Sequence, residues 1–533
     1  MKLITRFLYL PAACIALLSS CAEDQTESYD KFEDQALEAY MTQKHPELLE
    51  NYQTEGGYYV DVLEAGDPDA KPVNDTICWV KFDFSGRDLS GNIALTRRAS
   101  EAYQLGTFTK YTHYVPYYRY CGTANSGLIE GTYLAMRNTL HLGEEYARKK
   151  GIDREYLLRE GDIVRLYMPS RVVGSGGLGG DGGYEGQYSL SAKRPLIMEM
   201  EICGIDKNPL EAEGSLVDAF AKENGGMVMF TKDGEDGTEK RPTDPKDGKH
   251  PYNRSERWVS ACDTVAQLYV NVKYDPAKTV AGDQFGFNFT DAEHKVDNKA
   301  YNAGYEPYNM DDMSALEAKI AQALKDRFHG EGDDYKAYEG VDKLESDSVG
   351  LDGTAKIWYI GRFLDGFIFD TNIDEVKEII YGAGNYTEGT VKSYKPEDGG
   401  DLTAWYYTVP NLRYGQWAAF VTTSTNAYGT SGRSGSSTTS SSGNGYSSSY
   451  YDYLNYLNYS QMYYGNSGLY GGYYGDYYGY GGLGGYGYGG GYYGGYGYDY
   501  GSTGETSTTT TVTTEIPSFA PLIYQFYIEP AED

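Results

Sequence analysis

Glycines and acidic residues occur in this sequence at spacings that suggest nucleotide or metal chemistry, but their context argues against both. Residues 174–186 read G-S-G-G-L-G-G-D-G-G-Y-E-G and contain a formal G-x-G-x-x-G. A dinucleotide site needs a helix directly after that loop, because the helix N-terminus must face the pyrophosphate. Here more glycines and a strand-like run follow, which favours a surface loop over a nucleotide site. Asp233, Glu235 and Asp236 lack EF-hand spacing, which favours a solvated loop over a calcium site.

The cysteines do not suggest a metal site either. Six cysteines stand at positions 14, 21, 78, 121, 203 and 262, and no two of them form a C-x-x-C pair. Zinc ligation is therefore not predicted, and we expect neither a metal nor a cofactor. Cys78 and Cys203 lie in strand-like runs, where buried thiols are expected, although an oxidising compartment would permit a disulfide.

Residues 356–372, K-I-W-Y-I-G-R-F-L-D-G-F-I-F-D-T-N, predict a β-hairpin. Apolar residues lead to Gly361, Asp365-Gly366 offers the positive φ angles of a tight turn, and a second apolar run returns. The hairpin and its aromatic ending resemble the Y-x-G-x-x-x-D-G-x-x-F-D signature of FKBP-type prolyl isomerases. This family consists of small half-barrels wrapped on one helix.

Two later segments resemble the same family in the same order. Residues 415–432 form a strand-like run that ends in Tyr428-Gly429, as the family's strand does before its flap loop. Residues 516–528, I-P-S-F-A-P-L-I-Y-Q-F-Y-I, resemble its I-P-x-x-x-x-L-x-F-x-V-x-L closing strand. We therefore expect an FKBP-like domain over residues 256–533, with insertions at 276–350 and 433–515.

The resemblance implies an aromatic pocket that accepts a proline ring. The residues carried over to it by the family's motifs are Tyr359, Phe369, Asp370, Trp405, Tyr428, Ile516 and Tyr524. Tyr359, Phe369 and Tyr524 would form the walls, Trp405 the floor, and Asp370 the polar edge. Aromatic residues in strands are usually core residues. The convergence of so many on the family's pattern nevertheless favours a pocket.

Such a pocket would need no nucleophile, metal or general base, because prolyl isomerisation breaks no bond. The barrier is the partial double bond of the X-Pro amide, about 18–20 kcal/mol, and twisting that bond removes the resonance that makes the amide polar. An apolar pocket therefore favours the twisted state. In the family's arrangement the Tyr428 hydroxyl would donate a hydrogen bond to the substrate carbonyl, and the Ile516 backbone would make a second contact.

Departures from the family's pattern leave turnover open. Residues 401–416, D-L-T-A-W-Y-Y-T-V-P-N-L-R-Y-G-Q, replace the usual pocket helix. Pro410 is expected to end or kink any helix that begins there. The insertion at 433–515 lies beside Tyr428 and could cover the site, in which case the pocket would bind without turnover.

Residues 56–206 resemble a degenerate domain of the same family. Strand-like runs cover residues 58–63, 76–84, 163–168 and 194–205, and a helical run covers 127–136. Its pocket positions differ from the family's pattern: Ala94-Leu95 replaces Phe-Asp, Thr132 stands near the Trp position, and Val173 replaces a Tyr. We interpret it as a binding or structural relic. The predicted fold is α+β, with two FKBP-like antiparallel half-barrel domains, each packed on a helix, and a long Gly/Tyr-rich flap-loop insertion in the second.

The N-terminal sequence predicts that the protein is exported. Residues 1–20 combine Lys2 and Arg6 with an apolar run too short to span a membrane, which is typical of a signal peptide. The sequence L-S-S-C resembles a bacterial lipobox, so Cys21 would be lipidated and anchor the chain in the outer membrane. Residues 22–24, A-E-D, suggest either a surface-export signal or an ordinary polar tether. We expect the anchored protein to lie on the cell surface, with the periplasmic face of the outer membrane as the alternative.

Three further helices and a strand are predicted in the tether, the linker and the second domain. Residues 21–55 form a tether in which 29–41 show helical spacing, giving an apolar face that could dock on the first domain. Residues 207–255 form a linker with a short helix at 210–224, residues 265–274 alternate as a strand, and residues 313–328 form a helix.

Residues 441–500 contain 21 Tyr and 19 Gly and no basic residue. Such a segment cannot build an aliphatic core, but its tyrosines offer amphipathic faces that stack on sugars, peptides or one another. Because strands are predicted on both sides, it is an inserted loop rather than a tail. Disorder and an aromatic contact surface remain equal alternatives.

The net charge of −31, from 46 basic and 77 acidic residues, opposes binding to nucleic acid. The predicted function is a prolyl cis–trans isomerase or chaperone for proline-containing exported or outer-membrane clients. The alternative is a non-catalytic structural subunit that uses FKBP-like domains for docking in an outer-membrane protein complex. A third hypothesis is an adhesin that acts through its tyrosines.

Overall fold

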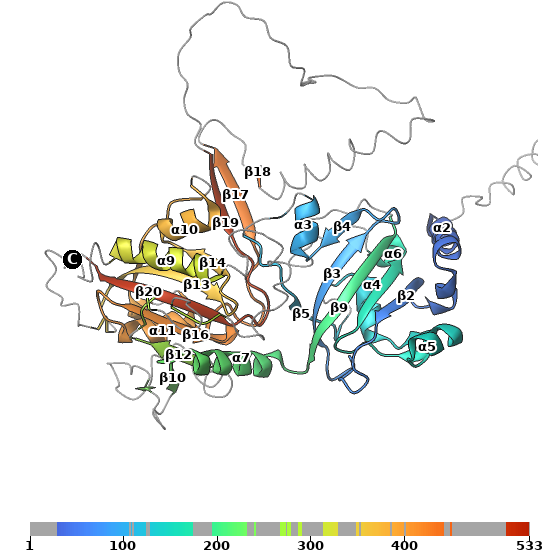
Figure 1. Cartoon of the computed structure of the whole chain (residues 1–533), viewed down its shortest axis with the longest axis horizontal. Helices are drawn as coiled ribbons and strands as arrows, with labels where there is room; N and C mark the ends of the chain where they lie inside the picture. The colour runs from blue at the N-terminus through green and yellow to red at the C-terminus, as the bar shows by residue number, and fades with distance from the viewer. Residues whose placement is uncertain are drawn as a thin grey trace, which may run out of the picture. The chain divides into compact units, whose positions relative to one another are not determined.

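The protein is seen here as a computed structural model (Figure 1). It describes residues 29–105, 108, 111–123, 128–173, 194–231, 239–240, 267–272, 274–278, 286–289, 313–328, 348–350, 353–383, 386–398, 401–441, 448–449 and 508–531. Several predictions therefore fall outside the described residues: the signal peptide, Cys21, Cys262, the 174–186 loop, the 233–236 acidic group and most of the Tyr/Gly segment. The chain divides into two units, residues 1–436 with 513–533, and residues 437–512.

The first part of the larger unit is built on a seven-stranded antiparallel sheet, in the order β1-β2-β8-β9-β3-β4 with β5 beside β3. Its elements are α2 (Tyr29–Lys44), a 3-10 turn (Pro46–Asn51), β1 (Tyr52–Gln53), β2 (Tyr58–Glu64), β3 (Trp79–Arg87), β4 (Ile93–Thr96), α3 (Ala99–Leu105), β5 (Tyr117–Tyr120), α4 (Glu130–Arg137), β6 (Leu140–His141), α5 (Glu144–Lys150), β7 (Glu155–Tyr156), β8 (Ile163–Met168), α6 (Ser170–Val173) and β9 (Leu196–Asp206). The strands β6 and β7 form a separate pair.

The second part is built on an eight-stranded sheet, in the order β11-β10-β12-β16-β20-β13-β14 with β15 beside β13. Its elements are α7 (Pro209–Glu223), β10 (Val228–Thr231), β11 (Glu239–Lys240), β12 (Leu268–Asn271), α9 (Met313–Phe328), β13 (Ala355–Phe363), β14 (Ile368–Thr371), α10 (Asp374–Tyr381), β15 (Lys392–Tyr394), α11 (Thr403–Thr408), β16 (Trp417–Thr422) and β20 (Leu522–Pro530), with 3-10 turns at Pro396–Asp398, Val409–Asn411 and Ser424–Asn426. All its pairings are antiparallel except β10–β11, which is parallel. The fold class is thus mixed α+β with mainly antiparallel sheets.

The smaller unit contributes a third sheet of three strands, in the order β18-β17-β19. These strands are β17 (Ser436–Ser441), β18 (Ser448–Ser449) and β19 (Thr508–Thr513). The strands β17 and β19 begin and end the insertion that the sequence predicts between residues 433 and 515.

Each large sheet has its own hydrophobic core. Leu37 and Met41 of α2 are buried in the first core, where the apolar face of the tether helix was expected to dock. The helix α9 buries Leu316, Ile320 and Leu324 in the second core.

Two segments pack differently from what the predicted domain limits suggest. The helix α7 lies in the predicted linker, yet Val217 and Phe220 are fully buried in the second core. Residues 99–115 follow β4 of the first sheet, and Ala102 and Tyr114 belong to the second core as well. The helix α7 and residues 99–115 therefore contribute side chains to the core of the second sheet.

Buried polar contacts join the β4–β5 connection to the second sheet. His113 Nε2 lies 2.6 Å from Asp365 Oδ2, and both side chains are buried. The His113 ring also stacks on Phe363 with centroids 4.4 Å apart and an interplanar angle of 4°. The connection is therefore held to the turn of the β13–β14 hairpin by both a polar and a ring contact.

The described residues contain free cysteines, and they offer neither a metal cluster nor a membrane-spanning helix. Cys78, Cys121 and Cys203 are free thiols, and Cys121 Sγ donates to the Cys78 carbonyl at 3.0 Å. No group of three or more His, Cys, Asp or Glu side chains in the described residues is placed to hold a metal ion. Among the described helices, none has the length and apolar composition needed to cross a membrane.

Candidate functional site

The predicted site begins at the β13–β14 hairpin, whose turn follows the local sequence. The Gly366 N–H donates to Phe363 O at 3.0 Å with φ of +92°, a conformation that glycine adopts without a Cβ clash. The strands then pair Gly361 with Asp370. A Cβ on Gly361 would lie 2.6 Å from Cζ of Phe369, so the glycine is what lets the Phe369 ring lie over β13.

The five predicted aromatic rings come together on one face of the second sheet. Tyr359 lies on β13, Phe369 on β14, Trp405 on α11 and Tyr524 on β20, while Tyr428 follows the 3-10 turn after β16. The Tyr359 centroid is 5.5 Å from Trp405 and 5.9 Å from Tyr524, and Trp405 is 5.5 Å from Tyr524. Phe369 is 5.7 Å from Tyr524 and 6.4 Å from Tyr428.

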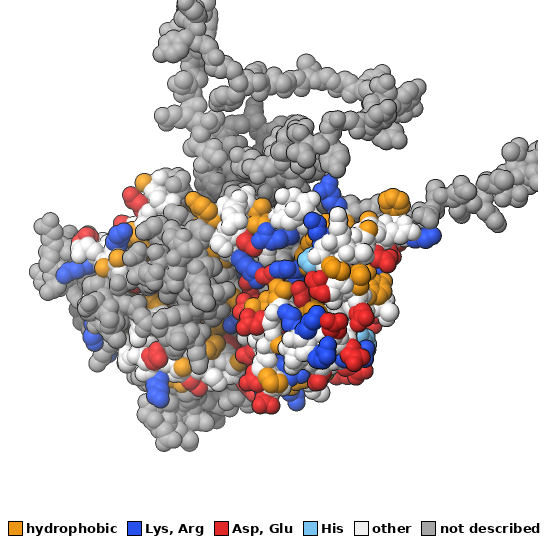
Figure 2. Space-filling view, turned by 45° about the vertical axis from the view of Figure 1, so that its right-hand side comes forward, with side chains coloured by type: hydrophobic (Ala, Val, Ile, Leu, Met, Phe, Trp, Pro, Cys, Tyr) orange, Lys and Arg blue, Asp and Glu red, His pale blue; other side chains and the backbone are white. Residues whose placement is uncertain are grey.

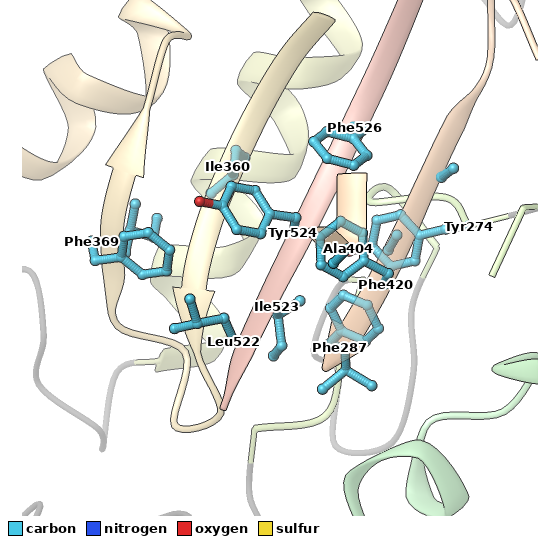
Figure 3. Packing of buried hydrophobic residues seen from close by; sticks show 14 of the residues in the cluster. Tyr274, Phe287, Ile360, Phe369, Ala404, Phe420, Leu522, Ile523, Tyr524 and Phe526 are labelled. Carbon is cyan, nitrogen blue, oxygen red and sulfur yellow. The ribbon is translucent and has the colours of Figure 1, made fainter. Parts of the chain in front are cut away.

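Tyr524 is the centre of this group, which we call the aromatic cluster: Tyr359, Phe369, Trp405, Tyr428 and Tyr524. Figure 3 shows the Tyr524 ring between Phe369 on one side and Phe420 on the other, and the centroids of Phe420 and Tyr524 are 5.3 Å apart. Only 2% of Tyr524 is exposed and 4% of Trp405. The interior of the cluster is therefore packed ring against ring.

The partly exposed residues at the edge of the aromatic cluster lie where a ligand could enter. Tyr359, Asp370 and Tyr428 are partly exposed, whereas Phe369, Trp405 and Tyr524 are buried. The Tyr359 hydroxyl donates to Asp370 Oδ2 at 3.2 Å. The cluster thus has an apolar interior and one polar edge formed by two phenols and a carboxyl group.

The tyrosine hydroxyls at and beside the polar edge are protonated, as hydrogen bonding to an amide carbonyl requires. Burial raises the pKa of Tyr359, Tyr428 and Tyr524 above that of an ordinary tyrosine, whose hydroxyl already keeps its proton at neutral pH. The oxygens of Tyr428 and Tyr524 are 3.3 Å apart, a long contact for two hydroxyls. A carbonyl oxygen that approaches this edge can replace the weak contact with a stronger hydrogen bond.

Arg433 is a member of the polar edge that the sequence did not identify. Its Nη1 donates to the Tyr428 hydroxyl at 3.1 Å, and its Cζ lies 4.7 Å from the Tyr428 ring centroid. Burial raises the pKa of Asp370, and the Arg433 charge is the largest influence that opposes this rise. Arg433 is the last basic residue of the chain, and that isolation within a Ser/Gly-rich stretch was the available signal.

Ile516 is buried in the same core as the aromatic cluster, and its backbone N–H and carbonyl are both hydrogen-bonded. The Ile516 N–H donates to Arg433 O at 2.8 Å, and the Ile516 carbonyl accepts from the Arg433 N–H at 2.8 Å. Its predicted backbone contact with a substrate would have to use the second lone pair of the carbonyl. The two backbone bonds also hold Arg433 beside Ile516.

The helix that carries Trp405 is short for the reason expected from its sequence. The helix α11 ends at Thr408, and Pro410 stands in the 3-10 turn that follows. Trp405 Nε1 is buried and has no hydrogen-bond partner among the described residues. A buried unpaired N–H costs stability, so either the packing of this indole or a ligand that accepts from its N–H must offset that cost.

We predict that Arg433→Gln raises the pKa of Asp370, because loss of the cation removes the interaction that most favours its carboxylate. A carbon-13 NMR titration of the Asp370 carboxyl group measures this shift. Lys392→Gln is the matched control, since Lys392 pairs with Asp401 at 3.0 Å. An unchanged titration in Arg433→Gln would contradict the assigned role.

Comparisons with known proteins give a distant likeness. No protein-family model matches the chain, and no curated protein does. Similar solved structures include FkpA from Escherichia coli, with 15% identity over 38% of this chain and 70% of that one and a TM-score of 0.20. A peptidyl-prolyl cis-trans isomerase from Pseudomonas syringae shows 15% identity over 34% of this chain and 98% of its own, with a TM-score of 0.20.

The three FKBP domains of wheat FKBP73 match over 90% of this chain and 97% of theirs, with 9% identity and a TM-score of 0.19. The chain is thus similar, remotely, to FKBP-type isomerases. Likeness at this level leaves the function to be argued from the geometry of the aromatic cluster.

Proposed function

We propose that the aromatic cluster binds X-Pro segments of polypeptides and promotes their cis–trans isomerisation. The observation that supports this is the meeting of five rings and one carboxyl group from positions 359 to 524 around a single apolar interior with one polar edge. In this proposal the proline ring enters between Tyr359 and Tyr428, and Tyr428 donates to the carbonyl of the preceding residue. Arg433 holds that hydroxyl in place, and Asp370 holds the neighbouring Tyr359 hydroxyl.

The chemistry follows from the polarity of the surroundings. A planar X-Pro amide is stabilised by resonance and by water, and the twisted amide has lost most of its polarity. Contacts with aromatic rings therefore cost the planar form its hydration while they cost the twisted form little, which lowers the barrier. No bond is made or broken, so no group of the cluster needs to exchange a proton.

A protease-coupled assay with an X-Pro peptide tests this proposal. We expect turnover by the wild-type protein, and at least an about tenfold loss of kcat/KM in Tyr428→Phe and in Asp370→Ala, the scale of a lost hydrogen bond to a charged or polarised group. Tyr103→Phe is the control, because Tyr103 lies on α3 and is 63% exposed. Equal activity in all four proteins would assign the turnover to a contaminant.

A second candidate is a structural subunit in which the cluster serves only as a core. This is favoured by the loop before β20, where Phe519 is buried with its centroid 4.7 Å from Trp79 of the first sheet. The loop is thereby engaged inside the molecule rather than presented to a client. Absence of turnover in the wild-type protein, together with a stable complex recovered from the envelope, would favour this candidate.

The setting we propose is the bacterial outer membrane, with Cys21 as a lipidated N-terminus and exported or outer-membrane proteins as clients. Its support is the lipobox-like L-S-S-C after an apolar run. Cys21→Ser should release the protein from the membrane fraction. Mass spectrometry of the mature N-terminus would identify the lipid directly.

A further inference from the structure

A cavity of about 240 Å³, lined by both polar and apolar side chains, lies on the first sheet, far in sequence from the aromatic cluster. Its floor is formed by β3, β9 and β8, which are hydrogen-bonded neighbours. Ser85 pairs with Glu199 across β3 and β9, and Glu199 pairs with Arg165 across β9 and β8. The next row joins Arg87, Ile197 and Tyr167 in the same way.

The two rows make a small grid in which five side chains can donate or accept hydrogen bonds and the sixth, Ile197, is apolar. Neighbouring strands are about 4.8 Å apart, and alternate residues on one strand are about 6.6 Å apart, so the floor is the size of one six-membered ring with its substituents. An apolar cavity of about 150 Å³ accepts a benzene ring. A cavity of about 240 Å³ accepts one ring that carries hydroxyl groups.

One wall of the cavity is aromatic. Tyr40 of α2 and His45, just after it, line the cavity together with Tyr167. The His45 centroid is 5.0 Å from Tyr167 and 6.0 Å from Tyr40. Such a wall offers flat apolar faces beside the polar grid, which suits a ligand with both a hydrophobic face and polar edges.

An unsatisfied hydroxyl group lies in the floor. Ser85 is 2% exposed, and its Oγ has no hydrogen-bond partner among the described residues. A buried hydroxyl without a partner costs stability. A ligand that both accepts from and donates to this hydroxyl would recover that cost, and Ser85 is therefore an observation in favour of a ligand that is independent of the cavity's shape.

The charges of this face point to a neutral ligand rather than an anion. Arg87 pairs with Glu101 at 2.6 Å, and Arg165 pairs with Glu199 at 2.8 Å. Arg98 pairs with both Glu199 and Asp83 at 2.8 Å. Figure 2 shows basic and acidic side chains interspersed over the described surface. Since three arginines are matched by three carboxylates, and the chain carries a net charge of −31, a phosphate or sulfate gains little here.

We propose that this cavity binds one neutral sugar ring. Each sugar hydroxyl donates and accepts, and neighbouring hydroxyls can bridge the Arg165 guanidinium and the Glu199 carboxylate while another reaches Ser85. The C–H face of the ring packs against Tyr40 and His45. The first sheet, whose pocket positions do not match a proline site, thereby has a binding site of its own.

Saturation-transfer NMR of the full-length protein tests this inference with glucose, galactose, mannose and N-acetylglucosamine. We expect transfer to at least one of them, with a Kd in about the millimolar range for a ligand of one ring. Tyr40→Ala should raise that Kd at least tenfold, and Ser85→Ala about two- to tenfold. Tyr103→Ala, on an exposed tyrosine of α3, should leave it unchanged.

The Ser85→Ala variant keeps the test interpretable. Because its hydroxyl has no partner in the described residues, the variant should fold and melt at or above the wild-type temperature. Binding unaffected by both Ser85→Ala and Tyr40→Ala would place the sugar elsewhere, for example on the Tyr/Gly segment, and would overturn the inference. No transfer to any of the four sugars, or binding of inorganic phosphate alone, would overturn it as well.

Discussion

Arg362→Met is expected to lower the free energy of unfolding of the second sheet by about 3–5 kcal/mol, the cost of leaving one partner of a buried ion pair alone. Arg362 is fully buried, and its Nη1 and Nη2 donate to Glu317 of α9 at 2.6 and 3.1 Å. Its Nε donates to Gln525 at 2.7 Å, and Nη1 also donates to Gly366 O at 3.1 Å. This one side chain therefore ties α9 to β13, to β20 and to the turn of the β13–β14 hairpin.

Guanidinium unfolding at pH 7 measures the effect. The double variant Arg362→Met with Glu317→Met should recover at least half of the loss, because the buried charge then disappears together with its partner. Lys392→Met, which breaks a more exposed pair with Asp401, should cost no more than about 1 kcal/mol. Equal losses in Arg362→Met and Lys392→Met would show that the buried pair is not what holds α9.

Raising the pH from 5 to 8 is expected to weaken the same part of the protein by about 3 kcal/mol through Glu213. Glu213 on α7 is 2% exposed and accepts hydrogen bonds from the Ser424 N–H and, at 2.8 Å, from Ser424 Oγ. Burial raises the pKa of Glu213 from 4.5 to about 7, and the bonds from Ser424 offset only part of that rise.

The direction of the pH effect follows from proton binding. Between pH 4.5 and about 7 the folded protein keeps the Glu213 proton that the unfolded chain has released. Stability is therefore fully present below pH 4.5, falls as the pH rises to about 7, and stays at the lower level above it. Glu213→Gln should remove this dependence, because the amide has a similar shape and does not titrate.

Unfolding at pH 5 and pH 8 in both proteins isolates the contribution of Glu213 from that of the other carboxyl groups. Glu211→Gln is the matched control, because Glu211 lies on the same helix and is exposed. An identical pH slope in wild type and Glu213→Gln would contradict the buried titration.

Local signals in the sequence predicted local structure well. The β13–β14 hairpin forms around Gly366, because a glycine turn between two apolar runs leaves few alternatives. The helix at residues 313–328 has the predicted limits, since its apolar spacing and the residues around it agree. The five rings named from the sequence lie in contact with one another, three of them on the neighbouring strands β13, β14 and β20; their role as a site stays a prediction.

Contacts between segments that lie far apart in the chain could not be predicted from the sequence. The sequence predicted a short helix at residues 210–224, but it cannot say which core covers that helix, and Val217 of α7 lies in the second core. Arg433 reaches the cluster only because its backbone pairs with Ile516 across the insertion. The grid of Ser85, Glu199 and Arg165 depends on strand register, which alternation alone does not determine.

The central claim is that the aromatic cluster accepts a proline ring, and exchange NMR of a short X-Pro peptide with the full-length protein tests it most directly. Without catalysis the cis and trans forms interconvert in tens to hundreds of seconds. The account predicts much faster exchange with the wild-type protein, its loss in Tyr428→Phe, and a shift of the Trp405 indole signal as peptide is added. An uncatalysed exchange rate together with an unmoved Trp405 signal at saturating peptide would contradict it.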